Sequence, residues 1–284
     1  MAPIVAVIAP GAMGAAVGKR LAERGLRVLT SLAGRSESTA ARAREAGMVT
    51  ASDEEIASAD FILSILPPGD ALPLAQRFAA ALTASNAKPV YVDCNAINPV
   101  TVKRVAAAIA PTGCQFVDCG IIGPPPKGAD FSPRLYASGE AAQRFAALRQ
   151  YGLDVRVLQG SLSAASALKM SYAGITKGTQ AIGAAMMPAA MRAGSATALL
   201  DELSFSQKEM LAQFKQQLPM MPAKAYRWIA EMQEIAGFVG DDPAARELYE
   251  GAAHFYQRIA EDFSGDRQDV AALTAFLGKN SSDS

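Results

Sequence analysis

Phosphate binding is predicted at four consecutive residues near the N-terminus: Gly11, Ala12, Met13 and Gly14. They follow an apolar run that begins at Ile4, and they precede a helical pattern that closes at Gly25. This order predicts a strand, a tight turn and a helix, whose first-turn N–H groups favour a bound pyrophosphate. The usual spacing is G-x-G-x-x-G, in which Ala9 replaces the first glycine here. A tight turn without a ligand is the alternative interpretation.

Lys169 is the candidate for proton transfer, because it lies in a long segment that is otherwise poor in charge. In a helix, Tyr172 would follow it on the same face three residues later. Burial would lower the pKa of the lysine, which suits a group that gives a proton to a carbonyl or takes one from a hydroxyl. On spacing alone, a lysine that extends its ammonium group to solvent is the favoured alternative.

The end of the second predicted strand indicates which dinucleotide the glycine turn would bind. In dinucleotide-binding domains an acidic residue there binds the ribose hydroxyls, whereas an arginine accommodates the 2′-phosphate of NADP. The segment from Val28 reaches Arg35 and Ser36 before the first acidic residue, Glu37. Arg35 could pair with a phosphate through its planar guanidinium, and Ser36 could donate a hydroxyl. NADP(H) is therefore the predicted cofactor, and a solvated loop arginine is the alternative.

Further strand ends supply walls for the same crevice, because ligands of open α/β sheets bind at the carboxyl ends of strands. Cofactor contacts are predicted after the third and fourth strands, at Leu66, Pro67 and Asn95. The amide of Asn95 suits ribose or nicotinamide, although an ordinary turn asparagine is equally compatible with this position. A substrate wall is predicted after the fifth strand, at Gly120, Ile122 and Gly123. A purely structural connection fits that loop nearly as well.

Short apolar runs alternate with helical patterns in the first 160 residues, which predicts βαβ units and a largely parallel sheet. Strands are predicted at Ile4–Ala9, Arg27–Leu32, Phe61–Leu66, Val90–Cys94, Gln115–Gly120, Leu135–Ser138 and Val155–Leu158. Helices are predicted at Ala15–Arg24, Ser38–Ala46, Leu72–Ala84, Pro99–Ala110 and Ala141–Tyr151.

The strand pattern stops after Gly160, and the remaining segments are all typical of helices. These segments lie near residues 162–191, 195–217, 222–237, 243–262 and 267–278. The predicted fold class is a Rossmann-type doubly wound α/β sheet followed by an all-α C-terminal domain. Residues 1–160 would bind the dinucleotide, and residues 161–284 would form a helical substrate and dimerisation domain. The tail at 279–284 is predicted to be disordered.

The composition favours an enzyme-sized protein whose partner is a small molecule. Lys+Arg and Asp+Glu are equal at 27 each, so no overall charge attracts nucleic acid or an anionic membrane. Neither a signal peptide nor a run of about 18 uninterrupted apolar residues is present, which favours the cytoplasm. Three cysteines without paired spacing and a single histidine, His254, predict no disulfide framework and no metal centre.

In order along the chain, these motifs resemble the landmarks of the β-hydroxyacid dehydrogenase superfamily, which includes 6-phosphogluconate and 3-hydroxyisobutyrate dehydrogenases. The resemblance extends to about residue 185 and rests on Gly11–Gly14, Asp93–Asn95, Asp118–Gly123 and Lys169. It implies a dinucleotide turn, a cofactor wall, a substrate loop and a catalytic lysine, respectively. The segment Pro222–Ile235 is similar to a divergent 6-phosphogluconate dehydrogenase-like subgroup.

Three departures from the family's pattern concern the substrate. The family's substrate loop reads Ser-Gly-Gly and holds a carboxylate, whereas this chain has Ile122-Gly123-Pro124. Ala173 stands where the family has an asparagine, and Tyr172 stands where 6-phosphogluconate dehydrogenases have a histidine. We therefore expect weaker carboxylate recognition and a less charged substrate than 6-phosphogluconate.

The resemblance and the motifs together predict an NADPH-dependent oxidoreductase that moves a hydride between nicotinamide and a small carbonyl/hydroxyl pair. Lys169 would be the general acid/base, with Tyr172 as its helper. Two alternatives stay open: an imine reductase-like enzyme in which Tyr172 supplies the proton, and a non-catalytic NADP(H)-binding sensor or scaffold. The resemblance also implies a homodimer that forms through the C-terminal helices.

One cluster in the C-terminal half has no assigned role in this scheme. It consists of Tyr226, Arg227 and Trp228, near Glu231 and Glu234. Such aromatic and arginine side chains occur in ordinary cores, at interfaces and in substrate walls, and the sequence leaves all three open.

Overall fold

A computed structural model describes residues 2–128 and 131–278 of the chain. The tail at 279–284, which we predicted to be disordered, lies outside the described residues. Contacts within the chain divide it into two compact units, with the division between Met170 and Ser171. The first unit contains the sheet, and the second is helical.

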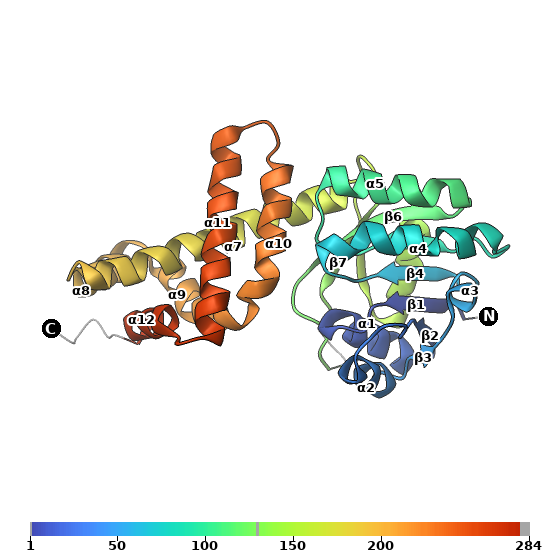
Figure 1. The fold of residues 1–284 in the computed structure, drawn as a ribbon, viewed down its shortest axis with the longest axis horizontal. Helices are drawn as coiled ribbons and strands as arrows, with labels where there is room; N and C mark the ends of the chain where they lie inside the picture. The colour runs from blue at the N-terminus through green and yellow to red at the C-terminus, as the bar shows by residue number, and fades with distance from the viewer. Residues whose placement is uncertain (1, 129–130, 279–284) are drawn as a thin grey trace. The chain divides into compact units, whose positions relative to one another are not determined.

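The first unit is built on one eight-stranded sheet (Figure 1). Its strands are β1 (Ile4–Ile8), β2 (Arg27–Thr30), β3 (Val49–Thr50), β4 (Phe61–Ser64), β5 (Val90–Asp93), β6 (Gln115–Ile122), β7 (Arg134–Ser138) and β8 (Asp154–Val157). Their order in the sheet is β3-β2-β1-β4-β5-β6-β7-β8, and only the β6–β7 pair is antiparallel. The strand order reverses between β1 and β4, which is where doubly wound sheets leave their ligand crevice.

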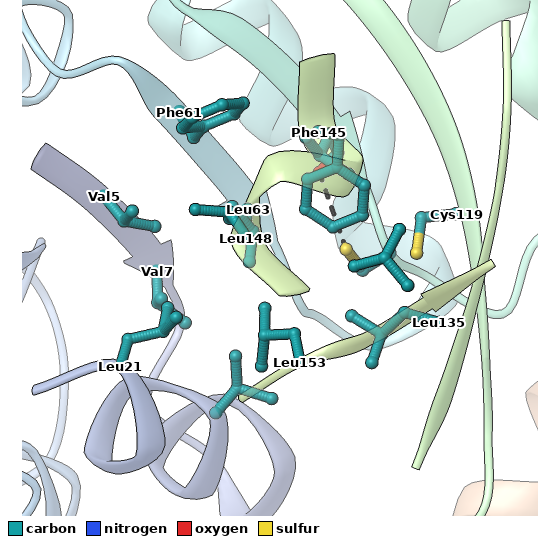
Figure 2. Close-up of a cluster of buried hydrophobic side chains, with 14 of the residues drawn as sticks. Val5, Val7, Leu21, Phe61, Leu63, Cys119, Leu135, Phe145, Leu148 and Leu153 are labelled. Carbon is teal, nitrogen blue, oxygen red and sulfur yellow. Dashed lines mark hydrogen bonds between the residues drawn. The ribbon is translucent and has the colours of Figure 1, made fainter. Parts of the chain in front are cut away.

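Helices cover both faces of this sheet, because alternate residues of each buried strand point to opposite faces. The helices are α1 (Ala12–Glu23), α2 (Glu37–Glu45), α3 (Asp53–Ile56), α4 (Ala71–Ala84), α5 (Pro99–Ile109) and α6 (Ala142–Phe145), with short 3₁₀ turns at 68–70, 110–112 and 146–151. Val5 and Val7 of β1 pack with Leu21 of α1 and with Phe145 of α6 on one face (Figure 2). Their neighbours in β1 pack with α4 and α5 on the other face.

The helical unit begins within a long helix, α7 (Ala164–Arg192), which crosses the division between the units. The other helices are α8 (Ala196–Ser206), α9 (Lys208–Gln217), α10 (Pro222–Phe238), α11 (Pro243–Ser264) and α12 (Gln268–Leu277). Helices α10 and α11 lie side by side as a hairpin (Figure 1). Asp242 begins α11 by accepting hydrogen bonds from the backbone N–H groups of Ala244 and Ala245, so the turn between them is fixed by a cap.

The structure confirms the predicted fold class, a doubly wound Rossmann-type sheet followed by a helical region. All seven predicted strands are present, with ends shifted by at most two residues. The sequence did not predict β3 or α3, and it predicted one continuous helix where the structure has α8 and α9. The chain breaks between these two at Gln207, whose φ of −136° and ψ of 46° are not helical.

Candidate functional site

The glycine turn connects β1 to α1 with very little space between them. A Cβ atom on Gly14 would lie 2.1 Å from the carbonyl oxygen of Ala9, so only glycine fits at this position. A Cβ atom on Gly11 would meet nothing within 4 Å. Gly11 begins α1, and no side chain of the described residues caps this helix. The first-turn N–H groups of α1 are therefore oriented to meet an anionic ligand at the turn.

Four strands align at the edge of the sheet that carries this turn. Ile8 of β1 pairs with Ser64 of β4, Ser64 pairs with Asp93 of β5, and Asp93 pairs with Asp118 of β6. The glycine turn and the loops after β4 and β5 therefore leave the sheet side by side, whereas β6 continues past Asp118 to Ile122 along β7. This register brings most of the predicted cofactor and substrate segments of the first unit to one edge.

Asn95 joins two of these loops. Its Oδ1 accepts a hydrogen bond from the Leu66 N–H at 2.5 Å, and its Nδ2 donates to the Ser64 Oγ at 2.9 Å. Because Asn95 is only 2% exposed, its amide holds the loop of Leu66 and Pro67 rather than facing the crevice. The geometry thus favours the turn interpretation of Asn95 and makes it a positioning residue, while Pro67 itself is exposed.

The predicted 2′-phosphate contacts lie where β2 leads into α2. Ser36 begins α2 and accepts a hydrogen bond from the Thr39 N–H, while Arg35 precedes it in an exposed loop. Arg42, which the sequence reading missed, donates from Nε to the Pro10 carbonyl at 3.3 Å. This bond ties α2 to the glycine turn and adds a positive charge beside it. No spacing in the sequence singles out Arg42, because Arg35 lies in the loop before α2.

Asp118 fixes the start of α7 against the sheet. Its carboxylate accepts hydrogen bonds from the Ser166 N–H at 2.7 Å and from the Ser166 Oγ at 2.6 Å. Burial raises the pKa of the Asp118 carboxyl to about 6, although these hydrogen bonds favour its ionised form. A carboxylate at the first turn of a helix also interacts favourably with the helix dipole. The resemblance placed Asp118 in a substrate loop, and the structure gives it this buried role.

Gly120 then allows α7 to approach β6 closely. A Cβ atom there would lie 2.8 Å from the Ala165 carbonyl oxygen and 3.1 Å from the Lys169 Cβ. The space on the Cβ side of Gly120 is therefore taken by α7, and the predicted substrate contact of Gly120 stays a prediction. Lys169 is half-buried, and its Nζ donates a hydrogen bond to the Ile121 carbonyl at 2.9 Å. The two contacts hold the lysine at the same edge of the sheet as the glycine turn.

The loop after β6 offers few backbone donors. Ile122 is half-buried at the end of the strand. Gly123 adopts a φ of +124°, and a Cβ atom there would lie 3.3 Å from the Pro133 Cα. Three prolines follow at 124–126 and have no N–H group. This loop therefore cannot hold a carboxylate with a series of amides.

Tyr172 belongs to the helical unit and follows Lys169 by three residues along the continuous helix α7. Half of its side chain is exposed. The cluster around Trp228 separates into two parts: Tyr226 and Arg227 are exposed, whereas Glu231 is buried and pairs with Lys177. Trp228 lies against Lys177 and Tyr256, so this part of the cluster is packed into the helical unit.

Residues 2–128 and 131–278 contain neither a membrane-spanning helix nor a cluster of metal ligands. In these ranges no helix is long and apolar enough to cross a membrane. In the same ranges no three His, Cys, Asp or Glu side chains group as they would around a metal ion.

Comparison with known proteins defines the class. Residues 4–150 match the NAD binding domain of 6-phosphogluconate dehydrogenase, and residues 190–259 match a domain of unknown function, DUF1932. The chain belongs to this dehydrogenase family and is a divergent, β-hydroxyacid dehydrogenase-like member, as its motifs predicted.

Particular relatives agree with this assignment. The conserved protein MTH1747, of unknown function and structurally similar to 3-hydroxyacid dehydrogenases, is 30% identical with a TM-score of 0.72 over 95% of this chain and 99% of its own. An uncharacterised 28.5 kDa protein of Methanothermus fervidus is 29% identical over 180 residues, which are 63% of this chain and 66% of that protein. The match thus spans slightly less than two thirds of that relative.

More distant structures share the fold. The 3-hydroxyisobutyrate dehydrogenase of Mycobacterium tuberculosis, solved with L-serine, has a TM-score of 0.72 at 18% identity over 97% of this chain and 99% of its own. The imine reductase of Myxococcus stipitatus, solved with NADP⁺, has a TM-score of 0.55 at 16% identity over 97% of this chain and 99% of its own. The first unit is therefore an NAD(P)-binding domain, related to those of NAD(P)-dependent 3-hydroxyacid dehydrogenases.

Proposed function

We propose that the protein is an NADP(H)-dependent oxidoreductase that acts on a small carbonyl/hydroxyl substrate, with Lys169 as general acid/base. The observation that carries this proposal is the position of Lys169. Its ammonium group is held by the Ile121 carbonyl at the sheet edge that also bears the glycine turn. A proton-bearing group at the same sheet edge as a dinucleotide turn is an arrangement suited to a hydride-transfer enzyme.

The residues of the turn fit a dinucleotide. Gly14 leaves the approach of α1 to β1 open, Gly11 leaves room in front of the helix, and Met13 lies between them. We assign the pyrophosphate to this turn, and the 2′-phosphate to Arg35 and Ser36. The loop of Leu66 and Pro67, which Asn95 holds in place, would form the neighbouring wall. When bound, NADP(H) supplies or accepts the hydride.

Lys169 contributes the proton. Its contact with the Ile121 carbonyl orients the ammonium group, so that a substrate oxygen in the same place would receive a charged hydrogen-bond donor. In reduction the lysine gives a proton to that oxygen, and in oxidation it takes one from the hydroxyl. Ile122 and Gly123 would border the substrate, and their lack of side-chain donors favours a substrate with little charge at that end.

Replacement of Lys169 by alanine tests the assignment. K169A should lower turnover by about two to four orders of magnitude and leave NADPH affinity nearly unchanged. The assay follows NADPH absorbance with a panel of aldehydes, ketones, 3-oxo acids and cyclic imines, with 3-hydroxy acids and NADP⁺ in reverse. Lys103→Ala, at an exposed position on α5, is the matched control.

Three outcomes contradict the proposal or part of it. Full turnover in K169A would remove Lys169 from the mechanism. Tight NADPH binding without turnover on any substrate would favour a sensor or scaffold. Loss of activity in K103A as well would show that a general loss of charge, not the position of Lys169, is responsible.

An imine reductase-like activity is the second candidate. Tyr172 is half exposed on α7, and the loop at 122–124 lacks the serine that would hold a carboxylate. In this alternative Tyr172 supplies the proton. Reduction of cyclic imines that survives K169A but is lost in Tyr172→Phe would establish it.

We further propose that the protein acts in the cytoplasm as a homodimer formed through its helical unit. Ile175, Ile182 and Met186 each expose more than half of their side chains along α7. Their spacing of seven and four residues puts them on one face of the helix. Such a stripe is typical of a helix that packs on another chain. Light scattering during size exclusion should give twice the mass of 29.6 kDa, and a monomer mass would contradict this proposal.

A further inference from the structure

The helical unit contains a cavity that hydride transfer with Lys169 does not use, although Tyr172, the proton donor of the second candidate function, borders it. Its volume is about 240 Å³, and it lies among α7, α9 and α10. This volume corresponds to about eight water molecules at roughly 30 Å³ each. It would hold a small metabolite, because drug-sized ligands occupy pockets of about 300 Å³ or more.

The side chains around this cavity are mostly hydrogen-bond donors. They are Tyr172, Thr176, Lys177, Gln180, Gln217 and Lys224, and the apolar part of the wall is Met220 and Trp228. No carboxylate borders the cavity among the described residues. Two ammonium groups, two amides and two hydroxyls around one small space present a surface suited to an anion.

The two lysines contribute differently. Lys177 is largely buried and forms an ion pair with Glu231, which compensates its charge and fixes its position. Lys224 is half-buried on α10, and no ion pair of its side chain occurs among the described residues. The uncompensated positive charge of the cavity is therefore that of Lys224. Lys224 lies on the same side of α10 as Trp228, which follows it by four residues.

Trp228 forms a fixed wall. The Lys177 ammonium lies 5.0 Å from the centre of its ring, and the Tyr256 ring meets it edge-on at 5.1 Å. The Tyr256 hydroxyl in turn donates a hydrogen bond to the Lys177 carbonyl at 2.6 Å. A wall held by two contacts, whose partners are themselves joined by a hydrogen bond, is in place before a ligand arrives, which lowers the entropic cost of binding.

We propose that this cavity is a binding site for a small organic anion. The anionic group, a carboxylate or a phosphate, pairs with Lys224, and the carbon skeleton packs on Trp228 and Met220. The site is built entirely from the helical unit and does not depend on the proposed hydride transfer. Four of its residues, Gln217, Met220, Lys224 and Trp228, lie in the segment 190–259 that matches a domain of unknown function. An anion site would be a binding function for the segment 190–259.

Trp228 provides the assay, because it is the single tryptophan of the chain. Its fluorescence, excited selectively in the intact protein, should change saturably with the anion and not with a neutral molecule of the same shape. The carboxylate pair is isobutyrate and isobutyramide, and the phosphate pair is glycerol 3-phosphate and glycerol. The pair that responds identifies the anionic group. Equal responses to the charged and neutral members, or no saturable response to either anion, would overturn the proposal.

Two variants locate the charge. Lys224→Ala should weaken anion binding at least tenfold, since a charge-assisted hydrogen bond is lost. Lys215→Ala removes an exposed lysine from α9 and should leave binding unchanged. If both variants bound the anion equally weakly, binding would reflect only nonspecific electrostatic attraction, and the proposed site would be wrong. Because the isobutyramide comparison uses the unaltered protein, the test holds even if K224A folds poorly. Failure of hydride transfer in K169A experiments would leave these titrations unaffected.

Discussion

Asp93 should make the stability of the first unit fall as the pH rises. Its carboxyl group is fully buried at the end of β5, and its Oδ2 has no hydrogen-bond partner among the described residues. Burial raises the pKa of Asp93 to about 7, and the nearby charge of Asp118 acts in the same direction. The hydrogen bond from the Asn95 N–H to Oδ1 opposes this shift without cancelling it.

The sign and size of the effect follow from linkage. Between pH 4 and pH 7 the folded protein keeps a proton on Asp93 that the unfolded chain has lost, so the free energy of unfolding decreases as the pH rises. The stabilising contribution is fully present below the ordinary pKa of 3.8 and is lost through about pH 7. The whole difference is on the order of 4 kcal/mol, of which roughly 2 to 3 kcal/mol falls between pH 5 and pH 8.

Asp93→Asn isolates the contribution of the Asp93 proton to the free energy of unfolding, because the amide has nearly the same shape as the carboxyl group and does not titrate. Urea unfolding followed by far-UV circular dichroism would give the free energy of unfolding of both proteins at pH 5 and pH 8. The difference in free energy of unfolding between D93N and the unaltered protein should shift in favour of D93N by roughly 2 to 3 kcal/mol over this range. Glu45→Gln, at an exposed position on α2, should show no such shift. A constant difference between D93N and the unaltered protein, within about 0.5 kcal/mol, would refute the reasoning.

Two further predictions concern the cofactor site. Gly14→Ala should lower the free energy of unfolding by about 3 kcal/mol or more, because its Cβ would overlap the Ala9 carbonyl oxygen. Gly11→Ala should leave both the free energy of unfolding and the melting temperature nearly unchanged. Equal losses of stability in the two variants would contradict the packing argument. Arg35→Ala should weaken NADPH binding by about tenfold or more and NADH binding very little, since a charged hydrogen bond is worth about 1.5–3 kcal/mol. Titration of both dinucleotides measures this, and equal weakening would remove the 2′-phosphate assignment.

The sequence predicts the strands well because each buried strand is a short, almost continuous apolar run between turn residues. It fails at β3, whose two residues, Val49 and Thr50, are both exposed and carry no such pattern. The missed helix α3 does have a local signal, because Ser52 and Glu55 form a reciprocal capping box. The break at Gln207 between α8 and α9 has neither proline nor glycine to announce it.

The site is less predictable, because its contacts join residues far apart in the chain. Ser166 lies 48 residues from Asp118, and no local pattern pairs a strand carboxylate with a helix that follows two strands later. The glycines show the same limit. Gly14 and Gly120 both permit a close approach: a Cβ on Gly14 would meet the Ala9 carbonyl oxygen, whereas a Cβ on Gly120 would meet α7. Only the tertiary fold shows which atoms approach a given glycine.

The chemistry of the loop after β6 limits how the substrate can be held. A carboxylate needs several donors, and this loop offers none from the prolines at 124–126 and none from the side chain of Ile122. The ammonium group of Lys169 is committed to proton transfer in the proposed mechanism, and a permanent ion pair with the substrate would keep its proton in place. The reacting end of the substrate should therefore be uncharged where it meets the first unit. If turnover nevertheless requires an acid, its charge must be held by residues outside the segment 122–126.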